Sequence, residues 1–141
     1  MRKVIGYTTG VFDMFHIGHL NILKKAKKEC DFLIVGVTTD ELCYKRKEKY
    51  PIICEKDRVE ILKSIKYVDK VVLQEDMDKL SAVKKYQCNK VFVGSDWKGT
   101  DTWNEYERQF NEQGVEVVYL EHTDGISSTV LRDKFNEKYK I

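Results

Sequence analysis

The stretch GVFDMFHIGH, residues 10–19, stands between an apolar run and an amphipathic segment. The run before it, KVIGYTT (3–9), is rich in the β-branched and aromatic residues typical of strands. After it, apolar residues recur with helical spacing and lysines lie opposite them: Leu20, Leu23 and Ala26. Gly10 closes the expected strand, and the helix is expected to begin near Ile17 or Gly18. This part of the chain therefore predicts a strand, a turn and a helix.

The same alternation continues along the chain. Further apolar runs occur at FLIVGVTT (32–39), VDKVVL (68–73), KVFVG (90–94) and VEVVYL (115–120). Helical periods follow them: Val59, Leu62 and Ile65; Leu80 and Val83; Trp103, Tyr106 and Phe110; Val130, Leu131 and Phe135. Five strand–helix units predict an α/β fold, a Rossmann-like, doubly wound, five-stranded parallel sheet with helices on both faces.

Composition favours a soluble globular protein with one domain, residues 1–141. Charged residues make up 34% and hydrophobic residues 42%, and the net charge of +2 argues against nucleic acid as a partner. The longest apolar run (32–37) is too short for a membrane span, and no apolar signal segment follows the first residues. The four cysteines form no C-x-x-C pair, so we expect them to be reduced and the protein to be cytoplasmic.

In doubly wound sheets, ligands bind beyond the carboxyl ends of the strands, where the strand order reverses. The candidate loops are those after the first, fourth and fifth strands: GVFDMFHIGH, GSDWKGTD (94–101) and HTDGISST (122–129). We therefore expect the site to be assembled from these three segments.

The first loop carries two of the three histidines of the chain, His16 and His19. Side chains three apart in a helical turn are neighbours, about 5–6 Å apart at Cβ, and a helix N-terminus attracts anions. The pair therefore favours a phosphate ligand. Zinc is the alternative, but the cysteines are not spaced as its other ligands, so no protein-held metal is expected.

The order of several motifs resembles a known family. HIGH, TTDEL, EKDR, KYVDKV, GSDWKG and TDGISST occur in the order found in the nucleotidyltransferase superfamily with its H-x-G-H signature. The chain is similar to the small cytidylyltransferases, and most similar to the glycerol-3-phosphate cytidylyltransferases. Class I aminoacyl-tRNA synthetases also contain HIGH, but their KMSKS motif is absent from this sequence.

The resemblance implies that a phosphomonoester attacks the α-phosphate of CTP and releases pyrophosphate. The acceptor would be sn-glycerol 3-phosphate, giving CDP-glycerol, with Mg²⁺ bound through the triphosphate and the enzyme a homodimer. Another phospho-alcohol (phosphocholine, phosphoethanolamine or a pentitol phosphate) and adenylyl transfer are the alternatives. A regulator without turnover and a nucleic-acid binder belong to other classes, which the intact histidine pair and the low net charge disfavour.

The resemblance also implies residue roles. The catalytic group would be His16, His19, Lys47 and Ser127. The nucleotide would be bound by Val11, Phe12, Asp13, Gly18, Lys49, Gly94, Asp96, Trp97, His122, Thr123, Gly125, Ile126, Ser128 and Thr129. The acceptor would be bound by Lys47, Lys79 and Lys66.

Several of these residues could instead have a purely structural role. Asp13 either orients a histidine or holds the turn, and Trp97 either stacks on the nucleotide or is buried. The lysine-rich run 44–51 reads mostly as a solvated loop, and we expect Lys79 on a helix surface. Ser127 or Ser128 can serve simply as a helix N-cap.

Two positions depart from the family pattern, and one tryptophan is left outside the site. His122 and Lys66 stand where these enzymes typically have arginine. Lysine keeps the charge but loses the bidentate fork, and histidine matches arginine only when it is protonated. Trp103 is expected in the core or at a dimer contact.

Overall fold

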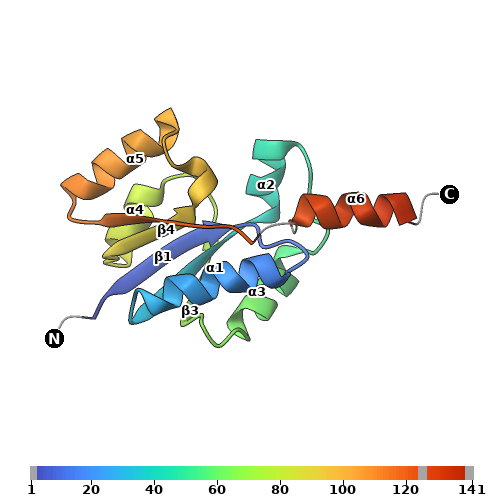
Figure 1. The fold of residues 1–141 in the computed structure, drawn as a ribbon, viewed down its shortest axis with the longest axis horizontal. Helices are drawn as coiled ribbons and strands as arrows, with labels where there is room; N and C mark the ends of the chain where they lie inside the picture. Colours follow the sequence, from blue (N-terminus) through green and yellow to red (C-terminus); the bar gives the residue numbers. More distant parts are fainter. Residues whose placement is uncertain (1–2, 124–126, 139–141) are drawn as a thin grey trace.

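The computed structural model describes residues 3–123 and 127–138, which form a five-stranded parallel sheet with helices around it (Figure 1). The strands are β1 (Ile5–Gly10), β2 (Phe32–Thr38), β3 (Lys70–Gln74), β4 (Lys90–Gly94) and β5 (Glu116–Leu120). Their order is β3-β2-β1-β4-β5, so the direction of winding reverses between β1 and β4. The doubly wound parallel sheet predicted from the sequence is confirmed.

Helices cover both faces of the sheet, as expected. The two layers contain α1 (Ile17–Lys28), α3 (Glu55–Lys63), α4 (Lys79–Lys85) and α5 (Asp101–Glu112). On one face, Leu23 of α1 belongs to the same buried cluster as Val35 of β2. The adjacent Ile34 points to the opposite face, where it belongs to a cluster with Phe110 of α5. Trp103 is part of this second cluster and is 7% exposed, so it lies in the core.

Three further helical segments follow carboxyl ends of strands: α2 (Asp40–Lys47), η1 (Ser95–Trp97) and α6 (Ser128–Lys138). The expected loop at 44–51 is partly wrong, because residues 44–47 continue α2. Thr39 caps this helix by accepting a hydrogen bond from Leu42 N, 3.1 Å away, and Leu42 is buried. The final helix extends away from the sheet (Figure 1). In the described ranges, every helix lacks the length and apolar character needed to cross a membrane.

A buried arginine joins the segments at the carboxyl edge of the sheet. Arg58 of α3 is 1% exposed, and its Nη1 donates to the carbonyl oxygens of Val11 (2.8 Å) and Thr38 (2.7 Å). Its Nε donates to Ile53 O (2.9 Å), and its Nη2 donates to Asp40 Oδ1 (2.5 Å). One guanidinium therefore connects the loop after β1, the end of β2, the start of α2 and the segment before α3.

Asp13 makes a second connection across the same loop. The residue is 4% exposed, and its carboxylate accepts hydrogen bonds from Ile52 N (2.8 Å) and Ile53 N (2.9 Å). Arg132 of α6 donates to the same carboxylate at 3.1 Å. Of the two roles expected for Asp13, these contacts support the structural one, since it holds the loop against two other segments.

We predict that Arg58→Met lowers the free energy of unfolding by about 3–5 kcal/mol, because it leaves buried carbonyls and a carboxylate without their donor. Urea denaturation of the wild type and the variant measures the difference. Arg108→Met is the matched control, because Arg108 also pairs with two carboxylates but on the exposed surface of α5. An equal loss of stability in both variants would contradict the stabilising role of the buried Arg58 hydrogen bonds.

Candidate active site

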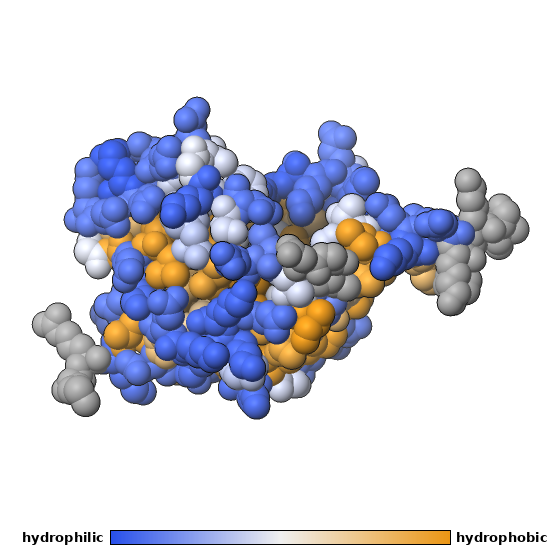
Figure 2. All heavy atoms as spheres, viewed as in Figure 1, coloured by the Kyte–Doolittle hydropathy of each residue, from blue (hydrophilic) through white to orange (hydrophobic). Residues whose placement is uncertain are grey.

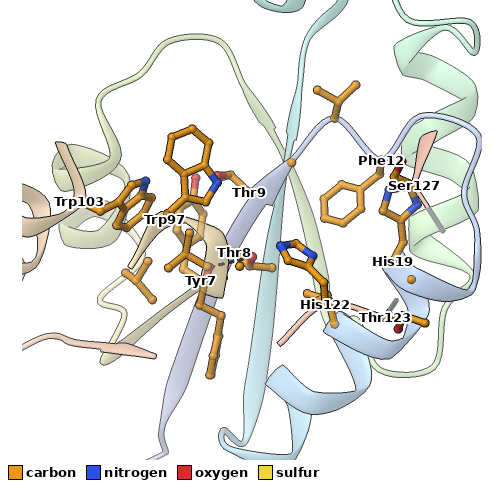
Figure 3. Close-up of a pocket in the computed structure, with 18 of the residues that line it drawn as sticks. Tyr7, Thr8, Thr9, Phe12, His19, Trp97, Trp103, His122, Thr123 and Ser127 are labelled. Atoms are coloured by element: carbon orange, nitrogen blue, oxygen red, sulfur yellow. Dashed lines mark hydrogen bonds between the residues drawn. The ribbon is translucent and has the colours of Figure 1, made fainter. Parts of the chain in front are cut away.

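An open cavity of about 310 Å³ lies at the carboxyl ends of β1 and β4, where the strand order reverses. Its walls come from the end of β1, the start of α1, η1 and the segment after β5, as Figure 3 shows. In the space-filling view, the surface is notched between α5 and α2, with apolar side chains deep in the notch (Figure 2). The sequence-predicted site residues that line the cavity are Val11, Phe12, His16, Gly18, His19, Lys79, Gly94, Trp97, His122, Thr123 and Ser127.

The two histidines form a stacked pair at the start of α1. Their ring centroids are 3.9 Å apart and their planes are inclined by 24°. His16 is the N-cap residue, and its Nδ1 accepts a hydrogen bond from Gly18 N at 3.0 Å. His19 reaches back, and its Nδ1 accepts from His16 N at 3.2 Å. Each ring is therefore fixed by a backbone N–H group of the helix that carries it.

These hydrogen bonds determine which nitrogen carries the proton. A neutral imidazole has one N–H and one acceptor nitrogen, and here Nδ1 is the acceptor in both rings. Nε2 must then be the protonated nitrogen of each ring, free to act as a donor. The Nε2 atom of His16 is buried and has no hydrogen-bond partner among the described residues. A bound anion at the cavity would supply that missing acceptor.

Both imidazoles are held in the neutral form. Burial lowers the pKa of His19 to about 4, with a further contribution from repulsion by His16, and burial also lowers the pKa of His16. The ring of His19 packs against Phe12, with centroids 5.4 Å apart, and against Phe15 at 5.3 Å. The pair therefore offers two N–H donors without a positive charge in the free protein.

The opposite wall contains His122 and Gly94. A Cβ atom at Gly94 would lie 2.6 Å from His122 Nε2, so the absence of a side chain makes room for the imidazole. The same Nε2 lies 3.1 Å from Asp96 Oδ2. Asp96 thus reaches the site through His122, and Trp97, 47% exposed, lines the cavity beside it. Of the two roles expected for Trp97, burial is wrong, and stacking on the nucleotide stays a prediction.

Lys79 lies in the cavity wall and not on a helix surface, so that expectation is wrong. The side chain is 8% exposed, and its Nζ donates to Thr9 Oγ1 at 3.1 Å and lies 6.0 Å from the Trp103 ring centroid. Burial, and then the charge of Arg46, lower its pKa to about 8. The first turn of α4 points this lysine inward because Val83, four residues on, is buried in the same layer.

The segment after β5 closes the site. Thr123 Oγ1 accepts a hydrogen bond from Asn21 Nδ2 at 2.8 Å, which joins this segment to α1. Ser127 Oγ accepts from Val130 N at 3.0 Å, so Ser127 is the N-cap of α6 and also lines the cavity. Gly125, Ile126 and the side chain of Ser128 lie outside the described residues, and Thr129 is exposed.

Three of the expected lysines do not line the cavity. Lys47 and Lys49 are exposed at the end of α2 and just after it. Lys66 is exposed between α3 and β3, with its Nζ 5.2 Å from the Tyr67 ring centroid. Because Lys66 precedes β3, it lies at the amino edge of the parallel sheet, opposite the cavity. The structure therefore brings together the histidines and Lys79, but not Lys66.

Several residues at the site were missed from the sequence. Thr8 and Thr9 lie near the end of β1 and line the cavity, and their place just before Gly10 would have indicated this. Arg58 was noted only as part of the EKDR motif, and its structural role was missed. Its position four residues before Leu62, on the buried face of α3, would have indicated that it is buried. Asn21 gave no such signal, because its role depends on the distant Thr123.

The described residues contain no group of three or more histidine, cysteine, aspartate or glutamate side chains that could hold a metal ion. The carboxylate of Asp96 pairs with His122 at the cavity wall. A divalent cation that enters with a triphosphate would be coordinated mostly by phosphate oxygens and water. Such a cation needs few protein ligands, so the side chains present at the cavity are compatible with it.

We predict that acidification removes stability through His19. Its pKa is about 4 in the folded protein and 6.5 as its ordinary value, so between these pH values the unfolded chain binds a proton that the folded chain does not. The stability advantage of the wild type over His19→Gln should therefore shrink as the pH falls from 6.5 toward 4. Denaturant unfolding of both proteins across this range measures it, and a constant difference would show that the ring is not held neutral.

Comparison with known proteins agrees with this geometry. A family model described as cytidylyltransferase-like matches residues 7–134. Glycerol-3-phosphate cytidylyltransferase of Bacillus spizizenii is 38% identical over 133 residues, 94% of this chain and 95% of that protein. FAD synthase of Pyrococcus abyssi is 43% identical over 97 residues, 68% of this chain and 64% of that protein. The crystal structure of a lipopolysaccharide core biosynthesis protein from Thermoplasma volcanium has a TM-score of 0.72 at 29% identity, covering 86% of this chain and 98% of that one. The chain belongs to the cytidylyltransferase-like family.

Proposed function

We propose that the protein transfers CMP from CTP to the phosphate of a small phospho-alcohol, sn-glycerol 3-phosphate, and releases pyrophosphate. The observation that carries the proposal is the histidine pair, whose two Nε2–H donors stand at a helix N-terminus beside the cavity. The near-full-length similarity to a glycerol-3-phosphate cytidylyltransferase supports the choice of nucleotide and acceptor.

The reaction needs charge stabilisation more than proton transfer. An oxygen of the acceptor phosphate attacks the α-phosphorus of CTP, and the bond to the bridging oxygen of the β-phosphate breaks. The electron pair of that bond leaves with pyrophosphate. A phosphomonoester has a second pKa of about 6 and is largely dianionic near neutral pH, so it attacks without a general base. The protein therefore has to position two polyanions and stabilise the charge that develops.

The histidine pair fits that task. Each Nε2–H donor would hydrogen-bond to an oxygen of the α-phosphate or of the leaving group, and the N-terminus of α1 would add its dipole. Because both Nδ1 atoms already accept hydrogen bonds from backbone N–H groups, the rings need no reorientation when the nucleotide binds. The role proposed for His16 and His19 is therefore to stabilise the transition state.

The other walls would hold the rest of the nucleotide. Ser127 and the N-terminus of α6 are suited to the β- and γ-phosphates, since a phosphate can bind where a helix presents free N–H groups. Trp97 and His122 would contact the nucleoside. Mg²⁺ bound to the triphosphate oxygens would neutralise part of their charge. Lys47 at the end of α2 and Lys49 just after it, both outside the cavity lining, would reach the bound substrates from the solvent side. The homodimer stays a prediction.

A second, polar cavity lies beside the main one and could receive part of the acceptor. A volume of about 210 Å³ between β3 and α4 shares Tyr7 and Lys79 with the main cavity. Aromatic faces are the usual partners of quaternary ammonium groups. The Tyr86 ring in this cavity is already approached by two ammonium groups, Lys70 at 5.1 Å and Lys85 at 5.4 Å from its centroid. Because Glu75, Asp76 and Asp78 also line this cavity, the proposal of sn-glycerol 3-phosphate as the acceptor rests on the similarity to a glycerol-3-phosphate cytidylyltransferase.

We predict that pyrophosphate is released from CTP with sn-glycerol 3-phosphate, and less efficiently with phosphocholine or phosphoethanolamine. A panel pairs CTP or ATP with each phosphomonoester and measures pyrophosphate.

His16→Ala or His19→Ala should lower kcat by about 10²–10³-fold, the scale of losing one transition-state donor.

Release with ATP but not with CTP would replace the proposal by adenylyl transfer, the alternative that the similarity to an FAD synthase raises. Wild-type kcat in both histidine variants would refute the role of the pair. Tight CTP binding without release in any pairing would favour a regulator.

A further inference from the structure

Tyr7 is a buried tyrosine whose hydroxyl group has no hydrogen-bond partner among the described residues. The residue lies in β1 and is 3% exposed, and its ring is stacked beside that of Tyr86, with ring centroids 6.4 Å apart. It lines both the main cavity and the second cavity. Leaving a buried hydroxyl group unpaired is costly, so this position is suited to a partner that arrives with a ligand.

The hydroxyl group of Tyr7 lies beside β2, the strand that separates β1 from the second cavity at β3. A Cβ atom at Gly36 of β2 would be 2.8 Å from Tyr7 Oη, so the glycine makes room for the hydroxyl group. Gly36 pairs in register with Val72 of β3, which lines the second cavity. Burial raises the pKa of Tyr7, so the oxygen keeps its proton and the group can donate a hydrogen bond.

Gln74 supplies a second donor on the same face of the sheet. Thr38 follows Gly36 by two residues in β2, so the two lie on one face, and Thr38 Oγ1 donates to Gln74 Oε1 at 2.8 Å. Gln74 is 7% exposed and lines the second cavity. Its Nε2 has only a weak contact with Met77 Sδ, 4.0 Å away. Two buried side chains of the second cavity therefore have donors that the fold uses weakly or leaves unused.

We propose that Tyr7 is a specificity-determining residue for the acceptor, which it recognises by a hydrogen bond to an alcohol hydroxyl group in the second cavity. The inference rests on the proposed function, because the acceptor phosphate reacts in the main cavity and the alcohol part has to extend from it. The two cavities meet at Tyr7. A hydroxyl group accepts one hydrogen bond and donates another. The acceptor hydroxyl group would accept from Tyr7 and donate to a carboxylate of the same cavity, such as Asp76.

Kinetics with deoxy acceptors test the assignment. The phosphates of 1,3-propanediol and 1,2-propanediol each lack one hydroxyl group of sn-glycerol 3-phosphate. For at least one of them, the wild type should have a kcat/KM roughly 10- to 100-fold lower, because buried donors stay unpaired. Tyr7→Phe keeps the ring, and it should reduce this preference by about 10-fold while the KM for CTP stays within about twofold.

Tyr119→Phe is the matched control, because its hydroxyl group donates to Glu107 at 3.1 Å and the residue lines neither cavity. This variant should keep the wild-type preference among the acceptors. An unchanged preference in Tyr7→Phe, or an equal loss of kcat/KM with all three acceptors, would overturn the proposal.

Thermal unfolding gives a readout that does not depend on turnover. Without ligand, Tyr7→Phe should be at least as stable as the wild type, because it loses only an unpaired hydroxyl group, whereas Tyr119→Phe should be less stable. sn-Glycerol 3-phosphate should raise the Tm of the wild type and of Tyr119→Phe more than that of Tyr7→Phe.

The two experiments separate this inference from the proposed function. If no pair of substrates yields pyrophosphate, the proposed function falls, while the difference in Tm shift would still support recognition by Tyr7. A lower stability of ligand-free Tyr7→Phe would assign the hydroxyl group to the fold and overturn the proposal. Equal Tm shifts in Tyr7→Phe and the wild type would refute it whatever the outcome for turnover.

Discussion

The hydrogen bonds from the backbone at the start of α1 to the Nδ1 atoms of His16 and His19 are the constraint on which the site depends. They fix the orientation of each ring and keep its proton on Nε2. They also cap the helix, so both donors are oriented when α1 forms. The donors are therefore set before any ligand arrives, which is the condition for stabilising a transition state at little reorganisation cost.

The loop that carries the pair is strained and has to be held. Phe12 (φ 55°) and Met14 (φ 49°) are both in the left-handed region, which costs of order 1–3 kcal/mol for each such residue. Asp13, between them, bonds to two backbone N–H groups and to Arg132, and Arg58 holds the carbonyl of Val11. The buried polar network thus keeps the loop in a conformation that local preferences alone would not select.

The fold followed from the sequence because its signal is local. Five apolar runs separated by helical periods leave few arrangements other than a doubly wound sheet, and the histidine pair lies at the end of the first strand. The contacts of Lys79 and Arg58 were not predictable in this way, because they depend on how the helices pack against the sheet. Lys66 was assigned by motif position, and the chain direction places it at the other edge.

The charges of the site are divided between two kinds of residue. The histidines contribute neutral donors, because burial keeps their pKa values low, and the positive charge in the cavity wall comes from Lys79. A neutral pair can approach the reacting phosphate without binding the ground state so tightly that the gain at the transition state is lost. Under the proposed function, the Lys79 ammonium would attract an anionic acceptor to the place where the two cavities meet.

The fixed, neutral imidazole pair is the central claim, and ¹⁵N NMR of the histidine side chains tests it most directly. In the free protein, both His16 and His19 should carry the proton on Nε2 with Nδ1 unprotonated, and His19 should keep this form until the pH falls to about 4. A proton on Nδ1 of either ring, or titration of His19 at its ordinary pKa of 6.5, would contradict the account.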